Sequence, residues 1–423
     1  MSRHQLGIDY AKQKDHEDVL SSYRNQFHIP KDKNGNELIY FCGNSLGLQP
    51  KSTKSYINQE LTDWANLGVE GHTDAKNPWL PYHEFLTEAT AKLVGAKPIE
   101  VVTMNSLTAN LHFMMASFYR PTKKRYKIVI ESDAFPSDKY AMESQLRHHG
   151  FNDTEGLILW KPRDGEDLLR YEDLETILEL QGNEIALVMI GGVNYYTGQF
   201  FNLKLISELG HKFGCMVGFD CAHGAGNVNL DLHDSGADFA VWCTYKYLNA
   251  GPGSLSGCFV HERHAYNKSL NRFTGWWSHN KDTRFNMRHE FDCIPGAEGW
   301  QLSNPPILSM AAIKASLDIF NSVGLNVLID KSKALTGYLE FLLKQLGEHT
   351  IKIITPEDPD SRGCQLSIQV LNANKTLHDK LTKVGVVTDW REPDVIRCAP
   401  VPLYNSFTDV YWMVKKMKAI LNE

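Results

Sequence analysis

The residues best suited to do chemistry in this sequence are an aspartate and a lysine that follow two successive apolar runs. Asp220 ends the run MVGFD, and His223 follows three residues later. Lys246 comes just after the next apolar run, FAVWC, and precedes a Gly/Pro turn. In open α/β sheets ligands bind beyond the carboxyl ends of the strands, so both side chains are expected to point into one crevice.

An acid and a lysine in one crevice suit pyridoxal 5′-phosphate (PLP). The Lys246 amine can form a Schiff base, and the Asp220 carboxylate can keep the ring nitrogen protonated so that the ring accepts electrons. The alternative is that Asp220 caps a turn and Lys246 is a solvated surface residue. The aromatic, uncharged stretch around Lys246, TYKYLN, favours the cofactor.

The phosphate of such a cofactor needs hydrogen-bond donors, preferably at a helix N-terminus. Asn105, Ser106 and Thr108 fall where a predicted strand ends and an apolar helix begins. A simple N-cap would use the same residue types, so this segment alone leaves both interpretations open. Phe135 follows another predicted strand and could stack on a ring, although taken alone it is typical of a core residue.

These residues need a sheet to position them, and the sequence predicts one. Short runs rich in β-branched and apolar residues alternate with amphipathic segments, which is typical of βαβ units and predicts a mostly parallel seven-stranded sheet with helices on both faces. The predicted strands are Glu100–Met104, Lys127–Ile130, Leu157–Trp160, Ile185–Ile190, Cys215–Phe219, Phe239–Cys243 and Gly257–Val260.

The chain is expected to form a large α/β domain and a smaller α+β domain. We place an N-terminal segment that packs with the small domain at residues 1–70, the large PLP-binding domain at 71–305 and the small C-terminal domain at 306–423. Flanking helices are predicted at Lys12–Phe27, after Pro50, over Pro306–Gly347 and from Ser406, where Asp409 completes a capping box.

Composition excludes several classes of function. The 423 residues are 42% hydrophobic and 22% charged with a net charge of −6, the balance of a soluble globular protein with no electrostatic reason to bind nucleic acid. No apolar run approaches the roughly 18 residues of a membrane helix. Eight scattered cysteines without a CxxC pair, and a start without the apolar core of a signal peptide, favour a reduced cytoplasmic enzyme without a metal site.

One glycine-bearing string matches a motif from a different class of enzyme. Gly43-Asn44-Ser45-Leu46-Gly47 fits the GxSxG elbow of serine hydrolases. That elbow follows several strands in an α/β-hydrolase, whereas here the βα alternation begins only afterwards. A serine hydrolase is therefore disfavoured.

In several strings that occur in the same order, the sequence resembles the kynureninase family, fold-type I PLP enzymes of the aspartate aminotransferase superfamily. The strings are FCGNSLGLQP, NSLTANLH, ESDAFPSDKY, FDCAHGAGN, TYKYLNAGPG, GWWSHN, SNPPIL and IRCAPVPLYNSF. The resemblance implies an α/β fold of the fold-type I, PLP-dependent transferase-like kind. It also implies hydrolysis of L-kynurenine or 3-hydroxy-L-kynurenine to an anthranilate plus L-alanine, in tryptophan catabolism or NAD biosynthesis, by a homodimer with shared active sites.

The resemblance also implies roles for single residues. Lys246 would form the Schiff base, Asp220 would bind the ring nitrogen, and Tyr245 would bind the phosphate and assist proton transfer. The other cofactor contacts implied are Leu107, Thr108, Phe135, Asp138, Gly191, His223, Trp276 and Asn304. The implied substrate contacts are Ser45, His72, Asn304 and Arg397, with Arg397 on the α-carboxylate and with Trp276 and Asn304 reaching across a dimer interface.

One departure concerns the phosphate site. Gly191-Gly192 stand where a hydroxyl residue is expected, so a phosphate contact is either lost or made by a backbone amide.

Two rivals remain. Another fold-type I enzyme, such as an aminotransferase or a cysteine desulfurase, would share Asp220 and Lys246 but not the strings GWWSHN and APVPLYNSF. A PLP-fold protein that acts by binding alone would be expected to have lost one of Lys246, Asp220, Tyr245 and Arg397. Whether a ring 3-hydroxyl is preferred depends on packing around the aryl group, so the sequence leaves it open.

Overall fold

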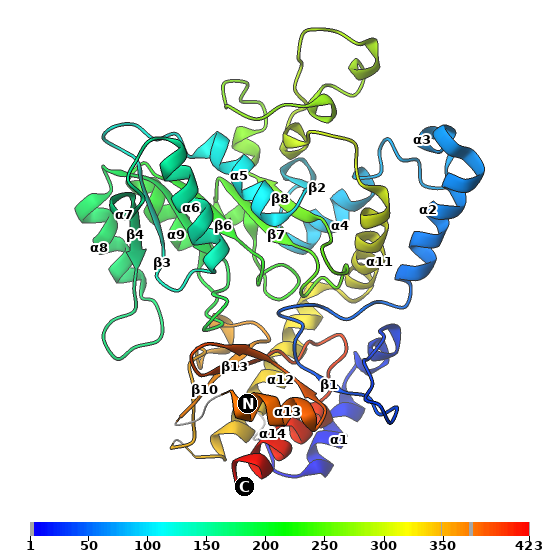
Figure 1. The fold of residues 1–423 in the computed structure, drawn as a ribbon, viewed down its shortest axis with the longest axis vertical. Coiled ribbons are helices and arrows are strands. Elements are labelled where there is room, and N and C mark those ends of the chain that lie inside the picture. The colour runs from blue at the N-terminus through cyan, green and yellow to red at the C-terminus, as the bar shows by residue number, and fades with distance from the viewer. Residues whose placement is uncertain (1–3, 348, 372–374, 423) are drawn as a thin grey trace.

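A seven-stranded sheet in the order β2-β8-β7-β6-β5-β3-β4 forms the centre of the computed structural model, which describes residues 4–347, 349–371 and 375–422 (Figure 1). Strand β8 is antiparallel to both of its neighbours, and every other neighbouring pair is parallel. The predicted mostly parallel seven-stranded sheet is therefore confirmed. Its strands are β2 (Val101–Met104), β3 (Lys127–Glu131), β4 (Leu157–Trp160), β5 (Ile185–Gly191), β6 (Met216–Asp220), β7 (Phe239–Cys243) and β8 (Ser256–Val260).

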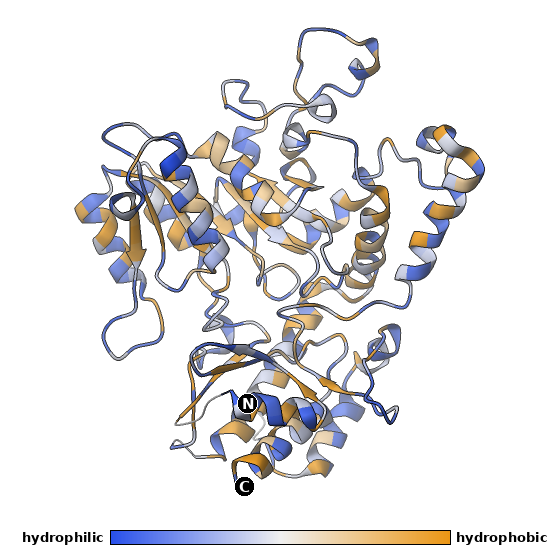
Figure 2. Cartoon of the chain, in the orientation of Figure 1, coloured by the Kyte–Doolittle hydropathy of each residue, from blue (hydrophilic) through white to orange (hydrophobic). Residues whose placement is uncertain are grey.

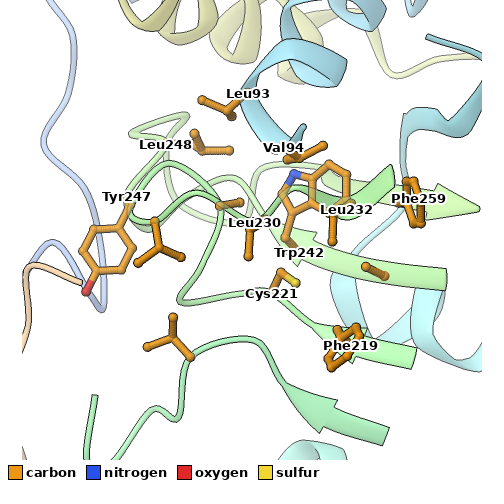
Figure 3. Packing of buried hydrophobic residues seen from close by; sticks show 14 of the residues in the cluster. Leu93, Val94, Phe219, Cys221, Leu230, Leu232, Trp242, Tyr247, Leu248 and Phe259 are labelled. Carbon is orange, nitrogen blue, oxygen red and sulfur yellow. The ribbon is translucent and has the colours of Figure 1, made fainter. Parts of the chain in front are cut away.

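Helices cover both faces of this sheet. Alternate strand residues such as Val188 and Trp242 pack with α4, α8, α9 and α11 on one face, and their neighbours such as Leu187 and Val241 pack with α5 and α6 on the other. Burial on both faces explains the nearly continuous apolar strands, which Figure 2 shows, and Figure 3 shows the packing around Trp242. The helices are α4 (Glu84–Val94), α5 (Leu107–Phe118), α6 (Pro136–His148), α8 (Tyr171–Gln181), α9 (Leu203–Lys212) and α11 (Ile307–Val323).

A second core lies below the large sheet in Figure 1 and belongs to the C-terminal part of the chain. Its sheet has the order β12-β13-β10-β9 and is antiparallel throughout. The capping box predicted at Ser406 and Asp409 is present at the start of α14. Its elements are α12 (Leu325–Lys344), β9 (Ile351–Ile353), β10 (Leu366–Val370), α13 (Thr376–Lys383), β11 (Val386–Val387), β12 (Asp389–Arg391), β13 (Val395–Cys398) and α14 (Phe407–Leu421).

The N-terminal segment joins this second core. Strand β1 (Ile39–Tyr40) pairs in parallel with β11, and the backbone of Cys42 forms an isolated parallel β-bridge with Ala399, just beyond β13. The helix predicted at Lys12–Phe27 is wrong in both bounds, because α1 covers Ile8–Glu17 and a short 3₁₀ turn follows. Asp18 ends the helix: its backbone is extended and its carboxylate accepts a hydrogen bond from the Leu20 amide at 2.9 Å.

The long helical stretch predicted over Pro306–Gly347 is two helices, α11 and α12, which meet at Gly324 with a bend of 80°. Helix α11 packs in the core of the large sheet, and α12 packs in the second core. The domain boundary proposed at residue 305 stays a prediction. No single helix in the described ranges is long and apolar enough to cross a membrane, and α11 and α12 meet that test only as a bent pair.

Asp238 provides a test of what stabilises the large domain. Its side chain is 3% exposed and accepts hydrogen bonds from Arg263 Nη2 at 2.7 Å, His264 Nε2 at 2.8 Å and His211 Nε2 at 3.0 Å. Burial alone would raise its pKa, but the two histidines and the arginine outweigh burial and hold the pKa of Asp238 well below its usual range. We expect Asp238→Asn to lower the free energy of unfolding at pH 7 by about 3–5 kcal/mol, because three donors lose their charged partner.

Urea denaturation at several pH values checks this prediction. A depressed folded-state pKa stabilises the protein above the unfolded-state pKa, so the difference between the wild type and Asp238→Asn should shrink as the pH falls below about 4. Asp234→Asn, a change at an exposed carboxylate nearby, is the matched control. Equal losses in both variants would contradict the assigned role.

Candidate active site

Residues from several strand ends line one cavity, whose empty volume is about 570 Å³ with its open mouth included. Asp220 ends β6, Gly191 ends β5, and Lys246 follows β7. The structure thus brings the aspartate and the lysine into one crevice. The cavity contains nine of the residues singled out in the sequence: Leu107, Thr108, Phe135, Asp138, Gly191, Asp220, His223, Tyr245 and Lys246.

The Lys246 amine contacts an imidazole and an aromatic face. Its Nζ lies 2.9 Å from His223 Nε2 and 5.8 Å from the centroid of the Phe135 ring. Burial, followed by the positive charge of Lys246, holds the pKa of His223 well below its ordinary value, so the imidazole is neutral and its Nε2 accepts from the lysine amine. In the described part of the chain the buried Nδ1 of His223 has no hydrogen-bond partner.

Two carboxyl groups face the lysine as a coupled pair. Asp138, in the first turn of α6, shares a side-chain hydrogen bond with Asp220, whose Oδ1 also accepts from the Ala222 amide at 2.7 Å. Burial and the neighbouring charge of Asp220 raise the pKa of Asp138 well above its usual range. Burial also raises the pKa of Asp220, but the nearby positive charge of Lys246 opposes that rise, so Asp138 is the member of the pair that holds a proton more readily.

Two helix N-termini open toward the same cavity. Thr108 lies in the first turn of α5 and Ser137 in the first turn of α6, with their hydroxyl oxygens 3.2 Å apart. Ser106 occupies the N-cap position of α5, but its side chain makes no capping hydrogen bond. The first amides of α5 are thus open to an anion rather than capped, which favours the phosphate interpretation of this segment.

The turn with the GxSxG pattern packs against the lysine. The Gly47 amide donates to the Tyr245 carbonyl at 2.8 Å, and a Cβ at Gly47 would lie only 2.2 Å from the Lys246 carbonyl oxygen. Ser45 lies in this turn outside the lining of the cavity, and the next helix described after it, α2 (Thr53–Leu67), begins at Thr53. The strand-turn-helix of a nucleophile elbow is therefore not formed.

Arg397 does not line the cavity itself, but it contacts Tyr195, which does. It is in β13, 1% exposed, and its guanidinium donates to the Tyr195 carbonyl at 2.7 Å and pairs with Asp389. Tyr195 lines the cavity and meets Phe135 edge to face at 5.3 Å. Within the described residues the buried Nε of Arg397 has no partner, so this guanidinium retains an unused donor.

Besides Ser45 and Arg397, three predicted site residues lie outside this cavity in the single chain. His72, in α3 (Gly71–Asp74), packs on Trp79 with ring centroids 5.4 Å apart. Trp276 is 43% exposed, and Asn304 lines a separate small cavity beside Asn105. Their contribution to the site across a dimer interface stays a prediction.

The cavity also contains polar residues that sequence reasoning missed: Glu131, Ser137, Asn194 and Tyr195. Glu131 is the last residue of an apolar strand, the same position that drew attention to Asp220, so its placement was open to prediction. Asn194 and Tyr195 follow β5 by a few residues in a loop, and no periodicity indicates where a loop residue points.

The donor set fits PLP. The cavity offers a lysine amine, a carboxylate at a strand end, an aromatic ring and a helix N-terminus with a hydroxyl group, which match the aldehyde, the ring nitrogen, the ring face and the phosphate of that cofactor. Two solved structures share the fold at 16% sequence identity. They are a cysteine desulfurase from Thermococcus onnurineus NA1 (TM-score 0.76, 100% of both chains) and a C-DES mutant with glycine covalently linked to its PLP cofactor (TM-score 0.77, 93% of this chain and 98% of that one). The fold and the site define a PLP-dependent enzyme of fold type I.

Sequence comparison identifies the family. The chain is 56% identical to a kynureninase from Myxococcus xanthus over 98% of its own length and 97% of the relative's, and 54% identical to one from Koribacter versatilis over 98% of both. A kynureninase from Nematostella vectensis is 48% identical over 97% of this chain and 93% of its own. The sequence profile of the kynureninase C-terminal domain matches residues 328–417. The chain belongs to the kynureninase family.

Proposed function

We propose that this protein is a PLP-dependent hydrolase that cleaves the Cβ–Cγ bond of L-kynurenine, 3-hydroxy-L-kynurenine or both, releasing an anthranilate and L-alanine. The observation that carries the proposal is the single cavity that unites Lys246, Asp220, His223 and Phe135 in a chain 56% identical to a kynureninase. The rival cysteine desulfurase is similar in fold alone, at 16% identity.

The cofactor would be held at four points. Lys246 would bind it covalently, Asp220 would hold its ring nitrogen, Phe135 would cover one ring face, and the start of α5 with Thr108 would bind the phosphate. Gly191 can offer only a backbone amide, and that amide donates to Glu131 at 2.9 Å. Bound PLP supplies an electron sink for the bond cleavages next to the substrate amine.

Proton transfer falls to the residues around the lysine. The Lys246 amine, when it is not bound to the cofactor, would be the base that takes the proton from the substrate α-carbon. Neutral His223 accepts a hydrogen bond from that amine and so orients it. Tyr245 lines the same cavity, and burial raises the pKa of its hydroxyl group, which keeps the proton available for the β-carbon.

The remaining residues would orient the substrate. Arg397 would use its unpartnered Nε to bind the α-carboxylate through a charge-assisted hydrogen bond. Water adds to the γ-carbonyl, the Cβ–Cγ bond breaks, the carbonyl fragment leaves as an anthranilate, and the β-carbon takes up a proton to become the methyl group of alanine. Ser45, His72, Trp276 and Asn304 would surround the aryl ketone in the assembled enzyme.

We further propose a homodimer that completes the site. The segment after β8 exposes large apolar side chains: Phe273 is 57% exposed, Phe285 54% and Met287 70%. Covering such residues with a second copy would bring Trp276 and Asn304 toward a neighbouring site. All eight cysteines are free thiols, which supports a reducing cytoplasmic location, and we place the reaction in tryptophan catabolism or NAD biosynthesis.

The proposed function is tested by the absorbance spectrum of the purified protein before and after addition of L-kynurenine and, separately, of 3-hydroxy-L-kynurenine. A visible cofactor band together with stoichiometric anthranilate and alanine is the expected result, and the two rates rank the substrates. A coloured protein that is inert to both compounds would overturn the substrate assignment and retain the cofactor. A colourless protein that PLP cannot reconstitute would overturn both.

Gly47 gives a further prediction about the site. Because a Cβ there would lie 2.2 Å from the Lys246 carbonyl, Gly47→Ala must move the lysine turn, and a displacement of about 1 Å costs about 10²-fold in rate. We expect kcat/KM to fall by about that factor. In Gly337→Ala the new Cβ would approach only the His4 imidazole, at 3.3 Å, so this control should retain full activity. A fully active Gly47→Ala enzyme would show that the contact does not position Lys246.

A further inference from the structure

Glu131 is a buried acid in the cavity that the reaction outlined above does not use. It ends β3, its side chain is 3% exposed, and it lines the same cavity as Asp138 and Asp220. No ion pair joins its carboxyl group within the described ranges of the chain. Burial of an unpaired charge costs free energy, so a buried carboxyl group without a cation beside it favours the neutral form.

The carboxyl group of Glu131 fills the space that a side chain at residue 191 would occupy. Its Oε1 accepts from the Gly191 amide at 2.9 Å, and a Cβ built on Gly191 would lie 2.8 Å from that oxygen. In the parallel pairing of β5 with β6, Gly191 is the register partner of Asp220. The carboxyl group therefore lies beside the strand end that presents Asp220 to the cofactor.

We propose that Glu131 is a positioning residue that acts through Asp220: as a neutral acid it leaves the ring nitrogen to one carboxylate, and on ionisation it adds a second negative charge beside Asp220. A second charge there strengthens the hold on a proton at the ring nitrogen. The state of Glu131 would thus set how the bound cofactor responds to pH.

The surroundings of Glu131 place this change in the physiological range. Burial raises its pKa to about 7, two backbone amides oppose that rise, and the charges of Asp220 and Asp133 add to it. The ionisable groups that face or neighbour it are Asp133, Asp138, Tyr195, Asp220, His223, Tyr245 and Lys246. Among them burial lowers the pKa of His223 well below its ordinary value and raises that of Asp138 well above its own.

The test is a pH titration of the cofactor absorbance of the holoenzyme without substrate, which requires bound PLP but no turnover. The wild type should show a transition near neutral pH that Glu131→Gln lacks, with the variant giving the low-pH wild-type spectrum throughout. Asp133→Asn, an exposed neighbour, should keep the transition with at most a small shift in midpoint. A transition with the same midpoint in Glu131→Gln and the wild type would overturn the proposal.

A second variant guards against misfolding. Glu131→Asp keeps the carboxyl group but withdraws it by one methylene from the Gly191 amide, so the transition should persist at a changed midpoint. An unchanged midpoint in Glu131→Asp contradicts the proposal even if Glu131→Gln does not fold. The inference rests on the proposed function only through PLP binding. A wild-type protein without a cofactor band would contradict the proposed function. A wild-type protein with a cofactor band whose pH dependence is the same in the Glu131 variants would contradict this inference alone.

Discussion

Lys246→Ala is expected to abolish turnover, lowering kcat by about 10⁴-fold or more, and to remove the visible absorbance band of the lysine-bound cofactor. Two functions are lost together in this variant, namely the covalent attachment of the cofactor and the base at the α-carbon. The amine is placed for both, because it lies 2.9 Å from His223 Nε2 inside the cavity that contains Asp220. Absorbance spectra and single-turnover rates with L-kynurenine measure the two losses separately.

Lys204→Ala is the control for charge removal, since Lys204 is exposed on α9 away from the cavity. It should keep both the band and the rate. Addition of a small primary amine should restore part of the α-proton transfer in Lys246→Ala without restoring covalent attachment. A Lys246→Ala enzyme that retains wild-type turnover would refute the assignment of the lysine and the mechanism built on it.

Arg397→Ala should weaken substrate binding by about 2 kcal/mol or more, about thirtyfold, with a smaller effect on kcat. The guanidinium is 1% exposed, is held by Asp389 and the Tyr195 carbonyl, and keeps a free Nε. Such a group offers its free Nε from a rigid plane that Asp389 and Tyr195 hold in place, which Arg397→Lys cannot reproduce. The substrate affinity of both variants, measured by equilibrium titration of the holoenzyme, should therefore fall.

Loss of Arg397 also leaves Asp389 without its buried partner, so stability must be followed alongside affinity. Arg391→Ala removes a half-buried cation from the same carboxylate, which Arg391 contacts at 3.0 Å, and serves as the matched control. It should reproduce part of the loss of stability without the thirtyfold loss of affinity. Unchanged substrate affinity in Arg397→Ala would remove this residue from the carboxylate role.

The sheet could be predicted from the sequence because its strands are buried on both faces and bounded by amphipathic helices. The two helical errors have local causes. Asp18 ends α1 through a hydrogen bond to the Leu20 amide, and Gly324 divides α11 from α12 within one continuous apolar pattern. Periodicity records which residues are apolar, and it does not record whether a helix turns by 80° between two cores.

The site residues also fall into those that the sequence could predict and those that it could not. Asp220 and Lys246 could be predicted because the end of a strand fixes where a side chain points. Arg397 became a candidate only through family resemblance, since its approach to the cavity depends on the small sheet packing against the Tyr195 loop. Glu131 ends a strand as Asp220 does, but a carboxylate without an evident partner is commonly a surface residue, so its position in the sequence does not by itself predict a buried acid.

The pairing of β1 with β11 has a consequence for synthesis of the chain on the ribosome. Ile39 and Tyr40 pair with Val386 and Val387, and Cys42 forms a β-bridge with Ala399, so the turn that supports Lys246 is anchored to residues synthesised long after it. The large sheet can assemble while the chain is still growing, but its lysine turn stays without this support until the C-terminal segment emerges. The lysine turn therefore gains this support only after the chain has been made through residue 399.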